Sequence, residues 1–422
     1  MADIVKKEIQ NNINLYYIQD DKYKTVSMSL FLHRKLDRAE ATKNALLSKV
    51  IRRGTAAYPS INKLNLYAEE LYGTLFDVNI TKKAYAQSIV STVSFLSDEY
   101  LPESIAAQGT ELMMDLIFKT NTENLSFNAE TVAVEKQNLR DDIEGLVNDK
   151  RSYANFRCIE EMCSGEDTAV FEFGYLEDID KIDEKTLYDH YMSILYTSPI
   201  DIFVVGSVDI DKTVHFIKNY MADFKFNIKP IPPCKNEHKK VKEVKYVEDT
   251  FDVAQGKLAI GLRTGIGIED ELYYALLTGN SIFGGGAHSR LFNTVREKMS
   301  LCYYAGSRLD KFRAIMLISS GIEFANFDKA KNEILNQLKN ISKGDFTDEE
   351  FEVSKNYIIN SYQSFKDSPY LMKDYYLGHC FSSNRDTIDE AVAKVRSVTR
   401  EDVVKAFSTV ETDTIYFLKG RE

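Results

Sequence analysis

Residues 283–304 read FGGGAHSRLFNTVREKMSLCYY and predict a helix end, a glycine turn, a second helix and a strand. The glycines of the turn are Gly284, Gly285 and Gly286. Ser289 can cap the second helix, which we expect to end at Arg296–Lys298. Because Tyr303 opens the strand seven residues after Arg296, this connection can direct a guanidinium and a phenol into one cleft. Both groups donate hydrogen bonds suited to peptide carbonyls.

The same stretch also fits a helix cap, a glycine turn and a surface arginine without further function. The glycines are not a phosphate-binding loop, because they lack the spacing and the lysine of a P-loop and follow a helix rather than a strand. They fit either a flexible loop or a turn that needs positive φ. His288 fits either a ligand or a solvated loop side chain.

Composition restricts the possible classes of protein. The chain has 422 residues, of which 44% are hydrophobic and 28% charged, so it can form two or more globular domains. Its net charge of 53 − 64 = −11, without a basic patch, argues against nucleic acid or an anionic membrane as partner. No stretch resembles a signal peptide or a membrane span, so we expect a soluble cytoplasmic protein. The five scattered cysteines predict free thiols.

The first half of the chain predicts strands followed by helices. Residues 12–18 and 25–33 should form a hairpin. Asp37 and Glu40 should form a capping box at the start of a helix that ends before Gly54. The remaining elements expected here are a helix from Ser60 to Gly73, strands at 75–81 and 86–95, helices at 99–119, 128–147 and 176–193, and a central strand at 201–206.

The second half of the chain repeats the first. Residues 228–240 hold three of the seven prolines and predict a linker between domains at 1–227 and 241–422. Ala45-Leu46-Leu47 and Gly54 recur 230 residues later as Ala275-Leu276-Leu277 and Gly284. Phe127, Glu130, Val134 and Lys136 recur 219 residues later as Phe346, Glu349, Val353 and Lys355. We therefore predict an α+β protein of two similar domains, each a mostly antiparallel sheet covered by helices.

These features together resemble a known family. The two halves, the linker, the glycine turn and the sequence S-R-L-F-x-x-x-R-E-K-x-x-L-x-Y resemble the pitrilysin/insulinase family of zinc peptidases, the inverzincins. The likeness covers essentially the whole chain. It is especially marked for the smaller members that assemble as pairs, such as bacterial two-subunit peptidases and the mitochondrial processing peptidase. In that family the corresponding Arg and Tyr contact the substrate main chain, which implies this role for Arg296 and Tyr303.

The zinc motif of active members is missing. Active members carry H-x-x-E-H on the first helix, in which two His bind zinc and the Glu activates water. Counted back from Gly54, the matching positions hold Ala45, Ser48 and Lys49, and the third ligand aligns with Asp142. Alanine has no donor atom, lysine repels Zn²⁺, and a catalytic zinc needs about three protein ligands. The resemblance thus implies that this chain holds no zinc and that any zinc lies in a partner.

The resemblance implies a non-catalytic subunit of a heterodimeric zinc endopeptidase, active only with a partner. The partner would be a family member with H-x-x-E-H, the substrate a peptide or unfolded protein, and the two domains would form half of a clamshell. This chain would supply Arg296 and Tyr303 in trans, and Gly284, Gly285 and Gly286 would help to draw in substrate.

A second hypothesis is a structural or peptide-binding scaffold without a role in proteolysis, in which both side chains only pack. The sequence leaves open whether the isolated chain forms a homodimer. A metal-free hydrolase has little support, because no G-x-S-x-G occurs.

Overall fold

The computed structural model describes residues 4–231 and 239–421, which form two compact units. Unit 1 comprises Met1–Glu144, Val170–Pro233 and Ser368–Leu377, and unit 2 comprises Gly145–Ala169, Cys234–Asp367 and Gly378–Glu422. The units are therefore not two contiguous halves, because each half of the chain contributes one segment to the other unit. Residues 232–238 of the predicted linker, with Cys234 among them, lie outside the described residues.

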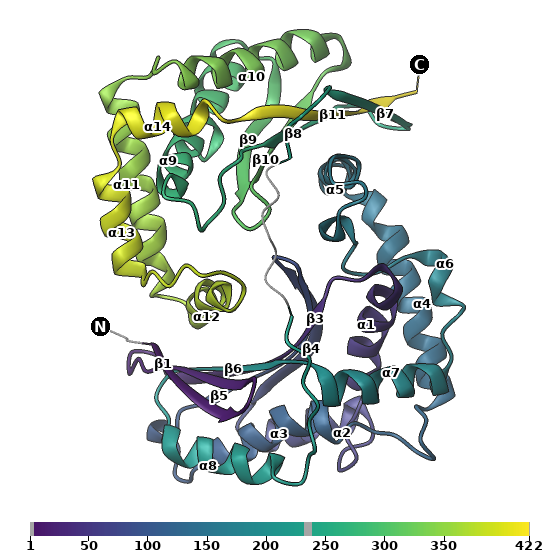
Figure 1. Ribbon diagram of the computed structural model, residues 1–422. Coiled ribbons are helices and arrows are strands. Elements are labelled where there is room, and N and C mark those ends of the chain that lie inside the picture. The colour runs from purple at the N-terminus through teal and green to yellow at the C-terminus, as the bar shows by residue number, and fades with distance from the viewer. Residues whose placement is uncertain (1–3, 232–238, 422) are drawn as a thin grey trace. The chain divides into compact units, whose positions relative to one another are not determined.

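The sheet of unit 1 has six strands in the order β1-β2-β6-β3-β5-β4 (Figure 1). Its strands are β1 (Ile4–Gln10), β2 (Ile13–Ile18), β3 (Thr25–Lys35), β4 (Leu75–Lys83), β5 (Ala86–Leu96) and β6 (Ile200–Val205). Strand β6 runs parallel to β2, and the other neighbouring strands are antiparallel. The strands predicted at 12–18, 25–33, 75–81 and 86–95 are present as β2, β3, β4 and β5. One predicted pairing between them differs.

The predicted hairpin of residues 12–18 and 25–33 is wrong. Strand β6 lies between β2 and β3 and pairs with both of them. Every residue of β6 is buried, which is the pattern of a strand covered on both faces. The central position predicted for residues 201–206 is therefore correct. In this position β6 separates β2 from β3, which follow each other in the sequence.

Helices pack on one face of this sheet. They are α1 (Arg38–Ile51), α2 (Ile61–Glu70), α3 (Ala106–Phe118), α4 (Ala129–Gly145), α6 (Leu176–Ile179), α7 (Glu184–Thr197) and α8 (Ile210–Met221). Met28, Leu30 and Leu32 of β3 point into the resulting core. The opposite face of the sheet carries Phe31 and Thr92, and helix α12 (Pro369–Leu377) lies against it (Figure 1).

The start of α1 agrees with the sequence in part. The Asp37 carboxylate accepts a hydrogen bond from the Ala39 N–H and caps the helix. Glu40 does not complete a capping box, because its carboxylate binds the Arg34 guanidinium at 2.6 and 2.8 Å. Arginine gives that carboxylate two charge-assisted hydrogen bonds in place of one backbone N–H.

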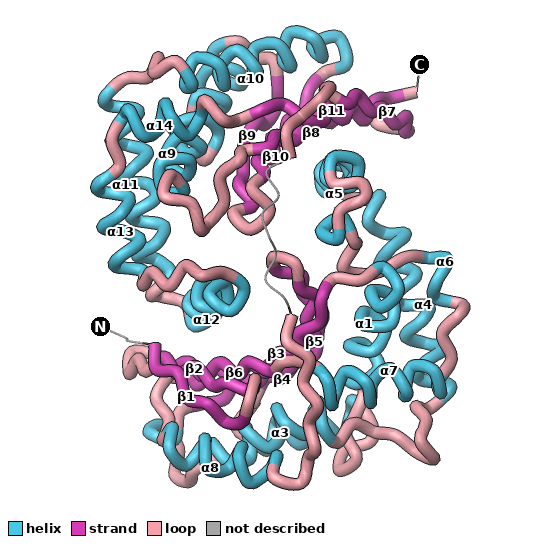
Figure 2. Tube along the Cα trace, in the orientation of Figure 1, coloured by secondary structure: helices cyan, strands magenta, loops and turns pink. Residues whose placement is uncertain are grey.

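The sheet of unit 2 has five strands in the order β7-β11-β8-β10-β9 (Figure 2). The strands are β7 (Lys245–Phe251), β8 (Gly256–Arg263), β9 (Cys302–Asp310), β10 (Ile315–Ile322) and β11 (Glu411–Gly420). Its helices are α5 (Lys150–Met162), α9 (Tyr273–Gly284), α10 (Phe327–Ser342), α11 (Asp348–Phe365), α13 (Ile388–Ser397) and α14 (Arg400–Phe407). Helix α5 lies against β8 and β11, so an N-terminal segment completes this unit.

The predicted repeat is present in the topology of the two sheets. The order β2-β6-β3-β5-β4 of unit 1 corresponds to β7-β11-β8-β10-β9 of unit 2, and the first pair is parallel in both. Two repeated lysines make equivalent contacts. The Lys136 ammonium donates to the Ile182 carbonyl at 2.9 Å, before α7, and the Lys355 ammonium donates to the Val398 carbonyl at 3.2 Å, before α14. The fold is therefore α+β with two similar, largely antiparallel sheets covered by helices.

Candidate functional site

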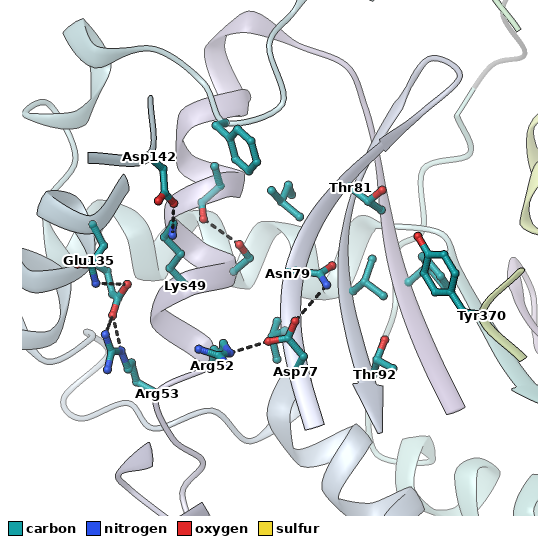
Figure 3. Close-up of a pocket in the computed structure, with 18 of the residues that line it drawn as sticks. Lys49, Arg52, Arg53, Asp77, Asn79, Thr81, Thr92, Glu135, Asp142 and Tyr370 are labelled. Carbon is teal, nitrogen blue, oxygen red and sulfur yellow. Dashed lines mark hydrogen bonds and ion pairs between the residues drawn. The ribbon is translucent and has the colours of Figure 1, made fainter. Parts of the chain in front are cut away.

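A cavity of about 1060 Å³ lies in unit 1, between the end of α1, the middle of α4, the sheet and α12 (Figure 3). Ala45, Ser48, Lys49 and Asp142 all line it. The structure thus brings together, from two helices, the four positions that the resemblance aligns with a zinc site. Strand β4, at the edge of the sheet, borders the same cavity with residues 77–81.

Ion pairs occupy the positions where metal ligands would stand. The Lys49 ammonium lies 2.6 Å from the Asp142 carboxylate, and the two side chains are 26% and 50% exposed. Arg53 pairs with the buried Glu135 carboxylate, next to this pair (Figure 3). The Ser48 hydroxyl donates to the Ala45 carbonyl at 2.8 Å within the helix. The Asp142 and Glu135 carboxylates are therefore already paired with Lys49 of α1 and with Arg53 just after it.

These residues do not fit a catalytic zinc ion. Ala45 has no donor atom, and the Lys49 ammonium occupies the one carboxylate that the alignment offers. Across residues 4–231 and 239–421, no group of three or more His, Cys, Asp or Glu side chains is placed to hold a metal. Zinc needs about three such ligands with an open position for water. We therefore derive no zinc chemistry from this chain.

Helix α12 adds an ammonium group to the cavity wall that sequence reasoning did not find. Lys373 is 8% exposed, and its ammonium donates to the Ser29 hydroxyl of β3 at 3.1 Å. Burial lowers the pKa of Lys373 to about 8. No sequence signal places this helix in unit 1, because its residues follow β3 by more than three hundred positions and carry no motif.

A buried Ser-His-Asp arrangement in the same sheet does not amount to a hydrolase site. His33 Nδ1 lies 2.7 Å from the Ser88 hydroxyl, and His33 Nε2 lies 3.2 Å from the Asp201 carboxylate. The exposed fractions are 1% for Ser88, 3% for His33 and 7% for Asp201. A nucleophile needs access to its substrate, so this network satisfies buried polar groups of three strands.

Arg296 lies on an irregular helix of unit 2. Residues Leu291–Lys298 form a π-helix rather than the predicted α-helix, and the Met299 N–H bonds to the Thr294 carbonyl five residues earlier at 3.0 Å. Ser289 accepts a hydrogen bond from the Phe292 N–H at 3.4 Å, near its predicted capping role. Such π-helical insertions occur frequently at functional sites. The Arg296 guanidinium lies over the Phe292 ring at 4.5 Å and is 39% exposed.

Tyr303 lies at a bulge of the edge strand β9. Tyr304 pairs with Gly321 and Cys302 pairs with Ile322, so Tyr303 is the extra residue. Tyr303 is 55% exposed, and its hydroxyl donates to the Glu323 carboxylate at 2.9 Å, which raises the pKa of the phenol. Bulges re-aim a side chain, and they are common next to active sites. Both family-aligned side chains of unit 2 thus stand at backbone irregularities and reach solvent.

The rest of the motif has structural roles. Arg290 binds the Glu350 carboxylate of α11 at 2.8 and 3.0 Å, and Leu291 is fully buried. The Gly284 position has no room for a side chain, since a Cβ atom there would stand 2.5 Å from the Ser307 hydroxyl of β9.

The three glycines do not have positive φ, so close packing rather than a left-handed turn explains Gly284. His288 is half-buried, with Nε2 3.0 Å from the Ser281 hydroxyl, and it holds the turn.

Comparison with known proteins places the chain among peptidase relatives. A family profile described as "Peptidase M16 inactive domain" matches residues 181–358. The "Probable inactive metalloprotease YmfF" of Bacillus subtilis (strain 168) is 34% identical over 419 residues, which cover 99% of this chain and 98% of that protein.

Solved structures extend the likeness. A conserved protein from Enterococcus faecalis V583 matches with a TM-score of 0.91 and 29% identity over 99% of both chains. A protease from Helicobacter pylori matches over 99% of this chain and 100% of that one with a TM-score of 0.84 and 15% identity, a likeness of fold alone.

Proposed function

The chain belongs to the M16 peptidases, the pitrilysin/insulinase family, as an inactive member, and from this premise we propose that it is the zinc-less subunit of a heterodimeric metalloendopeptidase. It binds an extended peptide and supplies Arg296 and Tyr303 to the zinc site of a partner with H-x-x-E-H. The partner supplies the zinc ion, the general base and the water.

One contrast within the chain carries this proposal. The zinc-aligned Lys49 and Asp142 of unit 1 neutralise each other in an ion pair, whereas the Arg296 and Tyr303 side chains of unit 2, at 39% and 55% exposed, reach solvent. Among the residues that the structure describes, the Arg296 guanidinium has a 3.5 Å ion-pair contact with its neighbour Glu297 and stacks on the Phe292 ring, and it makes no other ion pair. Side chains retained only for packing would be buried among apolar residues, and these two are not. Their exposure favours the subunit hypothesis over the scaffold hypothesis.

The edge strand β9 offers a way to hold the peptide. It pairs with β10 on one side and stands last in the order of its sheet. An extended peptide can add to such an edge, where main-chain hydrogen bonds provide affinity without reading sequence. The bulge at Tyr303 places the phenol at one end of that edge. A donor to the developing oxyanion of the peptide bond contributes about 10²–10³ in rate.

The test is reconstitution with the native partner. The chain is used to capture stoichiometric partners from its native extract, and peptide cleavage is measured for each protein alone and for the mixture, with and without chelator. We expect cleavage only by the mixture without chelator. Arg296→Ala and Tyr303→Phe should lower kcat/KM by about 10²-fold or more, because each removes a transition-state donor.

Lys298→Ala is the matched control, since Lys298 is an exposed cation two residues from Arg296 to which the proposal assigns no contact with the peptide. Cleavage by the partner alone at the rate of the mixture would overturn the proposal. The scaffold hypothesis would then stand, and Arg296 would lose its role.

A further inference from the structure

Two cations lie over one aromatic ring of unit 2, and a third cation, Arg308, lies close enough to feel the charge of one of them. The Arg151 guanidinium, at the start of α5, lies 4.2 Å from the centre of the Tyr304 ring, and the Lys257 ammonium of β8 lies 5.9 Å from it. Arg308 stands on the same face of β9 as Tyr304, because the two are four residues apart on one strand. We call Arg151, Lys257 and Arg308 the cation cluster.

The geometry of the sheet makes room for this ring. Lys257, Gly321 and Tyr304 form one row across β8, β10 and β9. A Cβ atom at Gly321 would stand 2.4 Å from the Tyr304 ring, so glycine lets the ring lie flat across the middle strand. The ring then offers its negatively polarised face to the Arg151 guanidinium and the Lys257 ammonium, which lie within about 6 Å of its centre.

Within residues 4–231 and 239–421, no ion pair neutralises the cation cluster. Lys257 donates only to the Gln255 amide oxygen, and Arg151 and Arg308 make no salt bridge. The carboxylates that act on the cluster are engaged elsewhere. Asp149 caps α5 through the N–H groups of residues 151 and 152, and Asp310 binds Arg313 at 2.7 Å. Withdrawal from water, followed by the like charges of Arg313 and Arg151, lowers the pKa of Arg308.

We infer that the cation cluster binds the carboxylate side chains of an acidic peptide that pairs with the free edge of β9. This inference rests on the proposed function and specifies its substrate class. Alternate side chains of a strand share one face at a spacing of about 6.6 Å, so glutamates or aspartates two or four residues apart would face the cluster together. The expected recognition pattern is therefore an acidic residue at every second position.

The charge of the rest of the chain makes this selection meaningful. A net charge of −11 repels acidic peptides from the surface in general, so binding of such a peptide requires a local set of unpaired cations. Arg308 on the edge strand, with Arg151 of α5 and Lys257 of β8 behind it, adds specificity to main-chain hydrogen bonds that do not themselves distinguish sequences. The cation cluster thus makes the surface near β9 locally positive on a chain whose net charge is negative.

Fluorescence anisotropy on the full chain tests this inference. The probe is a labelled nine-residue peptide, as long as β9, with glutamate at alternate positions. Its counterparts carry glutamine or lysine at the same positions. We expect the glutamate peptide to bind about tenfold more tightly than the glutamine peptide at low salt, and the difference to shrink as salt screens the charges.

Arg308→Gln should remove most of this preference and leave the affinity for the glutamine peptide unchanged. Arg151→Gln should act in the same direction and serves as a second variant. Lys331→Gln is the control, because it makes the same change in net charge on α10, where Lys331 pairs with Asp328.

Each outcome decides a different point. Equal binding of the glutamate and glutamine peptides would overturn the inference and leave peptide binding intact. Equal effects of Arg308→Gln and Lys331→Gln would show a general charge effect and would also overturn it. Failure of all three peptides to bind would overturn both this inference and the peptide-binding part of the proposed function.

Discussion

Two histidines introduced on α1 should turn the cavity of unit 1 into a zinc site. Positions 45 and 49 are four residues apart on one helical face, so Ala45→His and Lys49→His present two imidazoles together. The Asp142 carboxylate already reaches to 2.6 Å from the Lys49 ammonium and is freed by the substitution. The double variant then has His, His and Asp, the three protein ligands that a catalytic zinc site needs. The cavity of about 1060 Å³ leaves space for both rings.

The magnitude follows from the exposure of the ion pair that is lost. Lys49 and Asp142 are 26% and 50% exposed, so their pair contributes only about 0–1 kcal/mol to the free energy of unfolding. Ala45 is 1% exposed, so the larger histidine there should cost about 1–3 kcal/mol more, and the metal-free double variant should be less stable than the natural chain by about 1–4 kcal/mol. Zinc at about 100 times its Kd should then raise the free energy of unfolding by about 2.7 kcal/mol. Thermal unfolding with and without zinc measures this gain, and calorimetric titration measures the stoichiometry.

Two controls make the result specific. Lys49→His alone has too few ligands, so zinc should leave its unfolding temperature unchanged. Asp142→Asn in the double variant removes the third ligand and should weaken zinc binding by about tenfold or more. A double variant that folds, as judged by circular dichroism, yet gains no stability from zinc would falsify the alignment of these positions with the zinc site of active members.

Three further predictions concern stability. Gly284→Ala should lower the free energy of unfolding by about 1–3 kcal/mol, because the new methyl group overlaps Ser307 of β9. Gly145→Ala is the control and should change the free energy of unfolding by less than about 0.5 kcal/mol, because no atom crowds that position. Thermal unfolding compares the two variants, and equal losses would refute the packing argument. Burial lowers the pKa of His190 to about 4, below its unfolded value near 6.5. Protonation of the unfolded chain should therefore lower the free energy of unfolding as pH falls from 6.5 to 4, by about 2 kcal/mol at pH 5. His190→Gln should flatten that part of the curve of stability against pH, and an unchanged slope would contradict this. Lys355→Met should speed hydrogen exchange in α14, because it removes hydrogen bonds to two backbone carbonyls. Lys136→Met, at the equivalent position of the first repeat, should have a weaker effect in α7, because one such hydrogen bond is lost. Unchanged exchange in both helices would refute the equivalent roles of the two lysines.

Much of the fold could be predicted because the signals were local or repeated. The helix from Ser60 to Gly73 is present as α2, with Ser60 as its cap and Gly73 at φ +74° after its end. The two halves carry the same register of apolar residues, and the sheets carry the same order of strands. Capping, alternation and repetition depend on neighbours in sequence, so a single chain reveals them.

The errors arise where another contact or an irregular backbone replaces the structure that the local pattern predicts. The capping box at Asp37 was incomplete because Arg34 took the Glu40 carboxylate. The helix that carries Arg296 is π-helical, which no propensity predicts. For the candidate site, the sequence and its family resemblance named Ala45 and Asp142, and the structure places both on one cavity. Whether those positions and Arg296 act as proposed stays a prediction.

By itself, the sequence determined that this chain has two similar α+β repeats and contains no H-x-x-E-H, because both follow from residue types and their spacing. The tertiary structure alone decided that β6 separates β2 from β3, that α12 completes unit 1, and that Arg151 and Lys257 meet over the Tyr304 ring. The physical reason is that pairing of strands and gathering of charges depend on which surfaces are buried together, and residues far apart in the chain share no periodicity that records it.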